Sequence, residues 1–307
     1  MSAGWVAAQV RSQGLVHRCL GPAETRRLAE SGSLHDALEM LGSTAYAIDL
    51  HPELDVENSE RVLWASVLWD LRVLAGWAPP FGATRFRVLA GAFELANINA
   101  QLARCEGRPA APPYVLGSLA AIRDLSSAGT VDDLRRVLKA SPWGDPGTSE
   151  PDEFRLALQF SLVRQVAEGV PEAANWATSF AVLLLARCIT AGVLFAPGSP
   201  AEVNARAVMG ERVTRARTLE ELASAVPHRH SWVLEGAVSS EDLWTSETRW
   251  WARMWSEGLS LVQRGRPQPG AVVGAVGALA SDAWRIRASL EVAARGGSGI
   301  EELDGVA

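Results

Sequence analysis

Ile, Thr and Tyr are scarce in this chain of 307 residues, which contains only two tyrosines and is rich in Ala, Leu, Arg and Glu. Tyr, Ile and Thr are enriched in strands, whereas Ala, Leu, Arg and Glu favour helices. We therefore predict an all-α fold. The length is sufficient for two or three small domains, or one large domain, with buried cores.

Cysteine and excess positive charge are also lacking. The three cysteines, Cys19, Cys105 and Cys188, are odd in number and far apart, which predicts reduced thiols in or near the core of a cytoplasmic protein. The formal net charge is −6 at pH 7. Because nucleic-acid binding needs clustered Lys and Arg to neutralise phosphates, we expect no nucleic-acid partner.

Long apolar runs are missing as well. The longest segment without a formal charge is Pro267–Ser281, fifteen residues, which is too short to span a bilayer. The first residues lack the basic region and apolar core of a signal peptide. We expect no direct membrane insertion. The small-residue spacing of Gly270 and Gly274 is interpreted as a close contact between soluble helices.

A capped helix followed by an aromatic residue occurs three times. Each copy begins with Ser or Thr three residues before an acid, which is the spacing of a capping box. A leucine-rich helical stripe follows, and an aromatic residue stands thirteen or fourteen residues after the cap. The cap and aromatic residues are Ser33 and Tyr46, Thr130 and Trp143, and Thr218 and Trp232.

A second block repeats with a similar interval. The segments Glu94–Leu102 and Asp282–Leu290 share an acid, an Ile four residues later and a Leu eight residues later. Ser33 precedes Glu94 by 61 residues and Thr218 precedes Asp282 by 64, whereas the middle copy lacks the acid. Self-similarity of this kind indicates a repeated architecture. We predict three similar helical units, namely 1–112, 113–199 and 200–307, the third with a mobile C-terminal tail.

Apolar spacing predicts the remaining helices, and one of them is rich in tryptophan. The main ones cover residues 57–76, 84–106, 152–168, 172–195, 201–217, 241–264 and 271–295. The segment 241–264 holds four tryptophans, too many for one buried stripe. Because Trp is enriched at interface hot spots, Trp250 and Trp251 are candidates for contact with a partner.

No set of side chains forms a convincing catalytic or metal site. Asp132-Asp133 resembles the start of an aspartate-rich Mg²⁺ motif, but Arg135-Arg136 follows at once, so we interpret the acids as a solvated helix N-terminus. His228 and His230 lack a carboxylate or thiol at ligand spacing and are interpreted as solvated turn residues. We expect no catalytic residue, cofactor or metal, and no ATP site, since a Gly-rich phosphate loop is missing.

Two stretches resemble the AC39 family, the C or d subunit of V-type and A-type rotary ATPases. Residues 21–46 match its leucine-rich helix that ends in a Thr-x-Tyr turn, and residues 93–107 match its helix with an acid, an Asn, a basic residue and a terminal Gly. The matching residues of the second stretch are Glu94, Asn97, Arg104 and Gly107. The second unit lacks the acid and the Asn, and in the third Arg285 stands where Asn is expected.

The resemblance implies three helical domains in a funnel-like, pseudo-threefold arrangement. It also implies a non-catalytic socket that couples the central stalk to the membrane proteolipid ring, on the cytoplasmic face, and transmits torque for H⁺ or Na⁺ transport. The candidate interface residues are Glu94, Asn97, Arg104, Asp282, Arg285, Trp250 and Trp251.

Other interpretations stay open. An all-helical scaffold or ligand-binding protein unrelated to rotary motors is the main alternative, and an all-α enzyme using the aspartates of Thr130–Asp133 is a third. Glu94 and Asn97 also have a structural interpretation, because an acid and an amide three apart on a helix often bind neighbouring backbone or Arg groups. On that interpretation Glu94→Ala lowers stability before it changes affinity for any partner.

Overall fold

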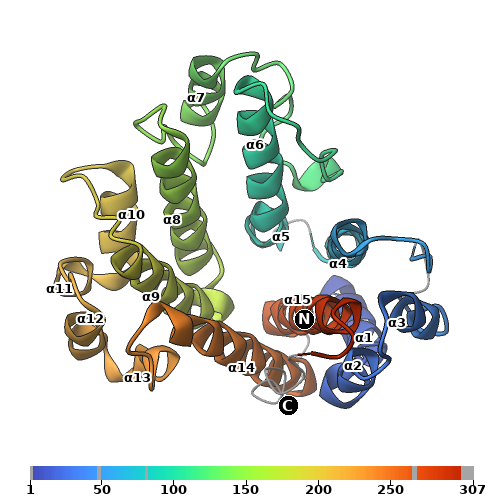
Figure 1. Ribbon diagram of the computed structural model, residues 1–307. Helices are drawn as coiled ribbons and strands as arrows, with labels where there is room; N and C mark the ends of the chain where they lie inside the picture. Colours follow the sequence, from blue (N-terminus) through green and yellow to red (C-terminus); the bar gives the residue numbers. More distant parts are fainter. Residues whose placement is uncertain (1–2, 47–49, 80–81, 265–267, 299–307) are drawn as a thin grey trace. The chain divides into compact units, whose positions relative to one another are not determined.

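The computed structural model describes residues 3–46, 50–79, 82–264 and 268–298 and is drawn in Figure 1. Within these ranges the chain is helical and contains no strand, which confirms the all-α prediction. The chain divides into two compact units: unit 1 comprises residues 1–82 and 248–307, and unit 2 comprises residues 83–247. The three-unit division and its funnel-like arrangement stay predictions.

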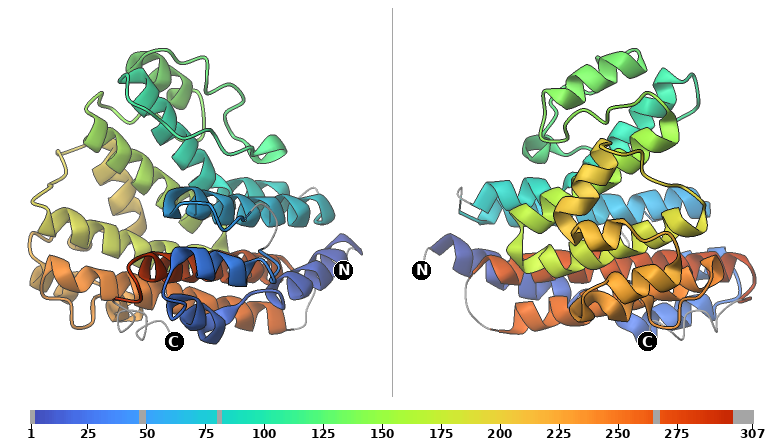
Figure 2. Two further views of the ribbon diagram at one scale, coloured as in Figure 1. Left: turned by 45° about the vertical axis from the view of Figure 1, so that its right-hand side comes forward. Right: turned by 90° about the vertical axis from the view of Figure 1, so that its left-hand side faces the viewer.

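Unit 1 is built around one long helix. Its helices are α1 (Ala3–Val16), α2 (Gly21–Ala29), α3 (Leu34–Leu41), α4 (Val56–Trp77), α15 (Pro269–Ala294) and, from Thr248 onward, α14 (Leu243–Gln263). Helix α15 packs against α1, α2, α3 and α4, as Figures 1 and 2 show. Nineteen of its 26 residues are buried. Helix α15 therefore forms the core against which α1, α2, α3 and α4 pack.

Helices α14 and α15 approach closely through two glycines. A Cβ atom added to Gly274 would lie 2.5 Å from the carbonyl oxygen of Gly258, and one added to Gly258 would lie 2.7 Å from that of Gly274. The interpretation of Gly274 as a close helix contact is confirmed. Near the same crossing Ser281 donates hydrogen bonds to the carbonyl oxygens of Gly277 (2.8 Å) and Trp251 (3.2 Å).

Unit 2 holds the helices from α5 to α13. They are α5 (Ala83–Leu89), α6 (Gly91–Cys105), α7 (Val131–Lys139), α8 (Pro151–Gly169), α9 (Ala174–Thr190), α10 (Pro200–Met209), α11 (Glu211–Thr214), α12 (Leu219–Ala225) and α13 (His228–Ser231). Helix α8 packs against α5, α6, α9 and α10, while α9 also packs against α12 and α13. Single-turn 3₁₀ segments lie at Gly117–Leu119, Pro171–Ala173, Trp232–Leu234 and Ser240–Asp242.

Two predicted helices are each divided in the structure. The helix predicted over 84–106 breaks at Ala90, between α5 and α6, and the one predicted over 201–217 breaks at Gly210, between α10 and α11. Gly210 has φ = +85°, a left-handed conformation that glycine adopts without steric cost. Continuous apolar spacing did not reveal these breaks.

Judged by length and composition alone, Pro171–Thr190 is long and apolar enough to cross a bilayer. Of the most apolar stretch of this segment, 61% is buried inside the structure. The core helix of a soluble protein can be equally long and apolar.

Candidate functional site

The three predicted helix caps are all present. The side chains of Ser33, Thr130 and Thr218 each accept a hydrogen bond from the backbone N–H three residues later, at 3.1 Å. Each bond satisfies one of the N–H groups that the first helical turn leaves without a partner. In α7 the box is complete, because Asp133 accepts in return from the N–H of Thr130. The caps fix where α3, α7 and α12 begin.

Helices α3 and α7 also end in the same turn. The Thr44 hydroxyl donates to the carbonyl of Leu41 (2.7 Å) and accepts from the N–H of Tyr46 (3.1 Å). Eleven residues after Thr130, Ser141 does the same: it donates to Leu138 (2.7 Å) and accepts from the N–H of Trp143 (3.2 Å). A hydroxyl that bonds its local backbone stabilises the turn and directs the next aromatic side chain. Thr44-x-Tyr46 and Ser141-x-Trp143 are therefore equivalent.

In unit 2 the aromatic side chain of this turn binds a buried acid. Glu94 on α6 is only 5% exposed. Its Oε2 atom accepts from the indole Nε1–H of Trp143 (2.7 Å), and its Oε1 atom accepts from the backbone N–H groups of Ala121 (2.7 Å) and Ile122 (2.8 Å). Three donors thus compensate the carboxylate for the water it loses on burial.

Unit 1 contains the same arrangement with different residues. Asp282 on α15 is fully buried. Its Oδ2 atom accepts from the Tyr46 hydroxyl (2.7 Å) and the N–H of Leu20 (2.9 Å), and its Oδ1 atom accepts from the N–H of Gly21 (2.8 Å). Burial raises the pKa of Asp282, although these three hydrogen bonds and the nearby Arg285 act to lower it. We call these two sets of contacts the Glu94 junction and the Asp282 junction.

The residues four and eight positions after each acid lie in the core beside it. Ile98 and Leu102 belong to a cluster with Leu134, Leu138 and Trp143, while Ile286 and Leu290 belong to one with Leu38, Leu41 and Tyr46. The sequence intervals associated Glu94 with the cap at Ser33 and Asp282 with the cap at Thr218. In the structure Glu94 meets the next capped helix, α7, and Asp282 meets the first, α3. The number of residues between a cap and an acid does not determine whether the acid lies before or after, in the chain, the capped helix that it contacts.

The third capped helix leads to a neutral version of this contact. His230 is 1% exposed, and its Nδ1 atom lies 2.9 Å from the hydroxyl of Ser179 on α9. Since Arg229 donates to Nε2 (2.9 Å), Nδ1 carries the proton and donates to Ser179. The interpretation of both histidines as solvated is wrong for His230, while His228 is exposed. The ring that makes this contact belongs to His230, twelve residues after the cap at Thr218, whereas the sequence pattern predicts Trp232 as the aromatic residue of this copy.

The residue three positions after each acid behaves differently in the two units. The side-chain amide of Asn97 donates to the carbonyl of Tyr114 (2.9 Å) and accepts from its N–H (2.7 Å). Arg285 is 2% exposed, and its Nε and Nη1 atoms have no hydrogen-bond partner in the described part of the chain. Its guanidinium carbon lies 4.9 Å from the centre of the Trp255 ring, and burial lowers its pKa to about 10.

Most of the predicted interface residues lie inside the fold. Glu94, Asn97, Asp282, Arg285 and Trp250 are buried. Trp251 is half-buried and stacks on Trp284, with 5.6 Å between the ring centres. Arg104 is exposed and donates to the carbonyl of Ala111 (2.6 Å) and to Gln101 (3.2 Å). A contact between these residues and a partner stays a prediction.

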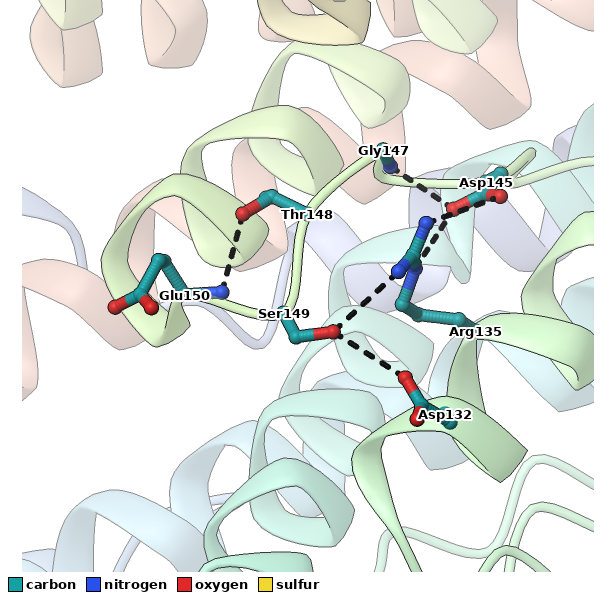
Figure 3. A network of polar contacts seen from close by, with 7 residues as sticks. All are labelled: Asp132, Arg135, Asp145, Gly147, Thr148, Ser149 and Glu150. Carbon is teal, nitrogen blue, oxygen red and sulfur yellow. Dashed lines mark hydrogen bonds and ion pairs between the residues drawn. The ribbon is translucent and has the colours of Figure 1, made fainter.

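Asp132 at the start of α7, together with Arg135, holds a neighbouring loop. Figure 3 shows Ser149, which donates to Asp132 (3.3 Å) and accepts from Arg135 (3.4 Å). Arg135 also binds Asp145 (3.1 Å), whose pKa is lowered by the N–H of Gly147 and by Arg135. These side chains anchor residues 145–150 to α7.

Among the residues that the structure describes, no group of three or more His, Cys, Asp or Glu is placed to hold a metal ion. Burial raises the pKa of Cys188 to about 11 and that of Cys19 further, so neither thiol is activated as a nucleophile.

Comparison of the sequence with models of known protein families found no matching family, and comparison with curated proteins found no match.

Proposed function

We propose that this chain is a non-catalytic rotor subunit of a V-type or A-type ATPase, similar to the AC39 family. In this role it would couple the central stalk to the membrane proteolipid ring at the cytoplasmic face. The observation that carries the proposal is the repeated module, in which a capped helix ends in a hydroxyl-stabilised turn whose ring binds a buried polar residue. Two modules are complete and use an acid, while the third capped helix leads to the ring of His230, which binds Ser179, with His228 at the position of the turn hydroxyl. The three contacts agree in number with the three similar domains that the resemblance implies, and each of them joins two of the predicted domains.

The chemistry of the modules also supports a mechanical role. Each junction carboxylate accepts three hydrogen bonds from its own unit, which leaves it poorly placed to transfer protons or bind a metal. Buried, satisfied polar networks make a fold rigid and specific. A subunit that transmits torque needs this rigidity and needs no catalytic group. On this proposal the three predicted domains 1–112, 113–199 and 200–307, a division distinct from units 1 and 2, form the funnel.

Co-purification from native membranes tests the proposal. The tagged chain would be expressed in its own cells and isolated under mild detergent, and the bound proteins would be identified by mass spectrometry. We expect central-stalk and ring subunits. Recovery of the chain alone from the soluble fraction, with motor subunits present elsewhere in the same cells, would contradict the proposal and favour a helical scaffold or ligand-binding protein.

The variant Glu94→Ala separates a structural role from direct contact with a partner. Because Glu94 is surrounded by its own unit, we expect the melting temperature to fall while partner recovery per folded molecule stays the same. Glu153→Ala is the matched control, since Glu153 is an exposed acid of the same compact unit and is not a candidate interface residue. Weakened recovery of the stalk by Glu94→Ala, with unchanged melting, would show that Glu94 itself contacts the stalk.

A further inference from the structure

Unit 1 contains a cavity of about 620 Å³ among α1, α4, α15 and the turn after α3. Small-molecule sites commonly measure roughly 300–1,000 Å³. Its lining is largely apolar and includes Leu15, Val62, Val73 and Leu279. Tyr46 also contributes to the wall, although its hydroxyl is committed to Asp282. The volume and lining suit an apolar body of modest size.

Two cations stand at this cavity with only one acid. Arg11 on α1 and Arg18 in the turn that follows this helix both line the cavity. Asp70 is the single acid in the lining, and its Oδ1 atom is 3.7 Å from Nη2 of Arg18, beyond hydrogen-bond distance. Arg11 lies 4.7 Å from the centre of the Trp77 ring and has no acidic partner among the described residues. The lining therefore has a net positive charge.

An exposed indole borders the same cavity. Trp69 lines it and is 60% exposed, with the Arg72 guanidinium 5.5 Å from its ring centre. Large exposed aromatic side chains beside a concave apolar surface are typical of binding sites. A ligand would cover the ring and remove its apolar area from water.

We propose that this cavity binds a small hydrophobic anion. An aliphatic or aromatic body would lie against Leu15, Val73 and Leu279, and its carboxylate, sulfonate or phosphate would accept hydrogen bonds from Arg11 and Arg18. An organic cation would meet two guanidinium groups against one carboxylate, and a neutral apolar molecule would leave Arg11 without a counter-charge. This inference is independent of the proposed rotor function.

Calorimetric titration of the whole chain with decanoate tests the inference, using decyltrimethylammonium as the probe of opposite charge and equal chain length, both below their micellar concentrations. We expect saturable binding of decanoate at one site, at least about tenfold tighter than that of the cation, because charge-assisted hydrogen bonds form only with the anion. Equal affinity for the two probes, or no saturable binding of decanoate, would overturn the proposal.

Two exposed positions provide variants that spare the core. Ala65 lines the cavity from an exposed site on α4, so Ala65→Phe should fill it and abolish decanoate binding. Arg11→Gln should weaken binding about tenfold. Arg215→Gln is the matched control, because Arg215 is exposed in unit 2 and paired with Glu211. With melting curves unchanged, wild-type affinity in Ala65→Phe would contradict the site.

Vesicles of phosphatidylglycerol distinguish a membrane lipid from a soluble anion as the source. If the anion is a lipid, wild-type chain should bind the vesicles, decanoate should compete, and Ala65→Phe should not bind. If it is soluble, decanoate should bind without any vesicle binding. Vesicle binding that neither decanoate nor Ala65→Phe alters, in a chain that fails to bind decanoate, would overturn the proposal.

Discussion

The Glu94 and Asp282 junctions both supply a buried acid with three hydrogen-bond donors, but they use different side chains and different chain connections. In unit 2 the acid and its ring donor are 49 residues apart, whereas in unit 1 they are 236 residues apart and join the two ends of the chain. The donors nevertheless correspond: two consecutive backbone N–H groups and one aromatic side chain. The module is therefore defined by its local contacts, and chain order varies around it.

The side chains differ in a compensating way. The tyrosine hydroxyl stands at the far end of its ring, while the indole N–H stands at the side. The shorter Asp282 is paired with Tyr46 and the longer Glu94 with Trp143, at the same distance of 2.7 Å. If only the acid or only the ring of one junction were replaced by that of the other, the length that the two side chains span together would change by about a methylene group or more. The acid and the ring must therefore change together.

The two junctions are unequal in how fully their polar groups are paired. Asn97, three residues after Glu94, exchanges two hydrogen bonds with one backbone residue, whereas Arg285, three residues after Asp282, is a buried cation with two unpaired nitrogens. Burial of incompletely paired charge is costly. We therefore expect unit 1 to respond more strongly than unit 2 to changes at its acid.

The largest effect should come from deleting the acids. Asp282→Ala removes the acceptor of three donors and the negative charge nearest Arg285, and should cost about 3–5 kcal/mol in unfolding free energy. Glu94→Ala leaves three donors but no buried cation, and should cost about 2–3 kcal/mol. Urea unfolding of both variants measures the difference. A larger loss for Glu94→Ala would reverse the proposed ranking.

Glycine substitutions in the two acid-bearing helices should give the next largest contrast. In Gly274→Ala the new Cβ would lie 2.5 Å from the Gly258 carbonyl, so α14 and α15 must separate, at about 2–3 kcal/mol. In Gly91→Ala the obstacle, at 2.6 Å, is the terminal methyl of Leu162, which can rotate away. Its cost should be below about 1 kcal/mol, because alanine also favours the helix. Equal losses in thermal unfolding would contradict this account.

Removal of a single donor should have a smaller effect. Tyr46→Phe deletes the hydroxyl that binds Asp282 and retains the ring, so the core stays filled. Because two backbone donors remain, we expect a loss of about 1–2 kcal/mol in urea unfolding. No loss at all would mean that the hydroxyl contributes nothing to the junction.

The pH dependence should separate the units by sign. Burial raises the pKa of Asp282 above 3.8, so its contribution to stability is fully present below pH 3.8 and is lost as pH rises through the raised value. The pKa of Asp145 is lowered, so its contribution is present above pH 3.8 and lost as pH falls through the lowered value. Each slope is limited to about 1.4 kcal/mol per pH unit.

Unfolding free energies between pH 2 and 7 test these signs. Asp282→Asn should remove the decline with rising pH, and Asp145→Asn should remove the decline with falling pH. Asp133→Asn is a useful comparison for the latter, because hydrogen bonds from Thr130 and the charge of Arg136 lower its pKa as well. A steeper rise of stability with pH in wild type than in Asp282→Asn would show the opposite sign for Asp282.

Much of the local structure could be predicted from the sequence, because it depends on neighbouring residues. The caps at Ser33, Thr130 and Thr218 follow from side chains that bond their own backbone, and the core positions at Ile98 and Ile286 follow from helical spacing. Contacts of this kind depend little on the rest of the fold.

The partners of the acids could not be predicted in the same way. A repeat interval is compatible with an acid helix before or after its capped helix, and the match of Asp282 with Tyr46 depends on packing between the chain's two ends. The contact of His230 with Ser179 was missed because the ring stands one residue earlier than in the other copies. Thr44 and Ser141 each place a hydroxyl two residues before the ring, and this shared feature of the sequence marks Tyr46 and Trp143 as equivalent positions.

Double-mutant cycles test the central claim, that each aromatic donor and its acid form one unit. The two cycles combine Tyr46→Phe with Asp282→Asn and Trp143→Phe with Glu94→Gln, with unfolding free energies measured in urea. Residues in one hydrogen-bond network are coupled, whereas independent sites are additive within about 0.5 kcal/mol. We predict coupling of about 1 kcal/mol or more in both cycles. Additivity in either cycle would contradict the assignment of that ring and acid to one junction.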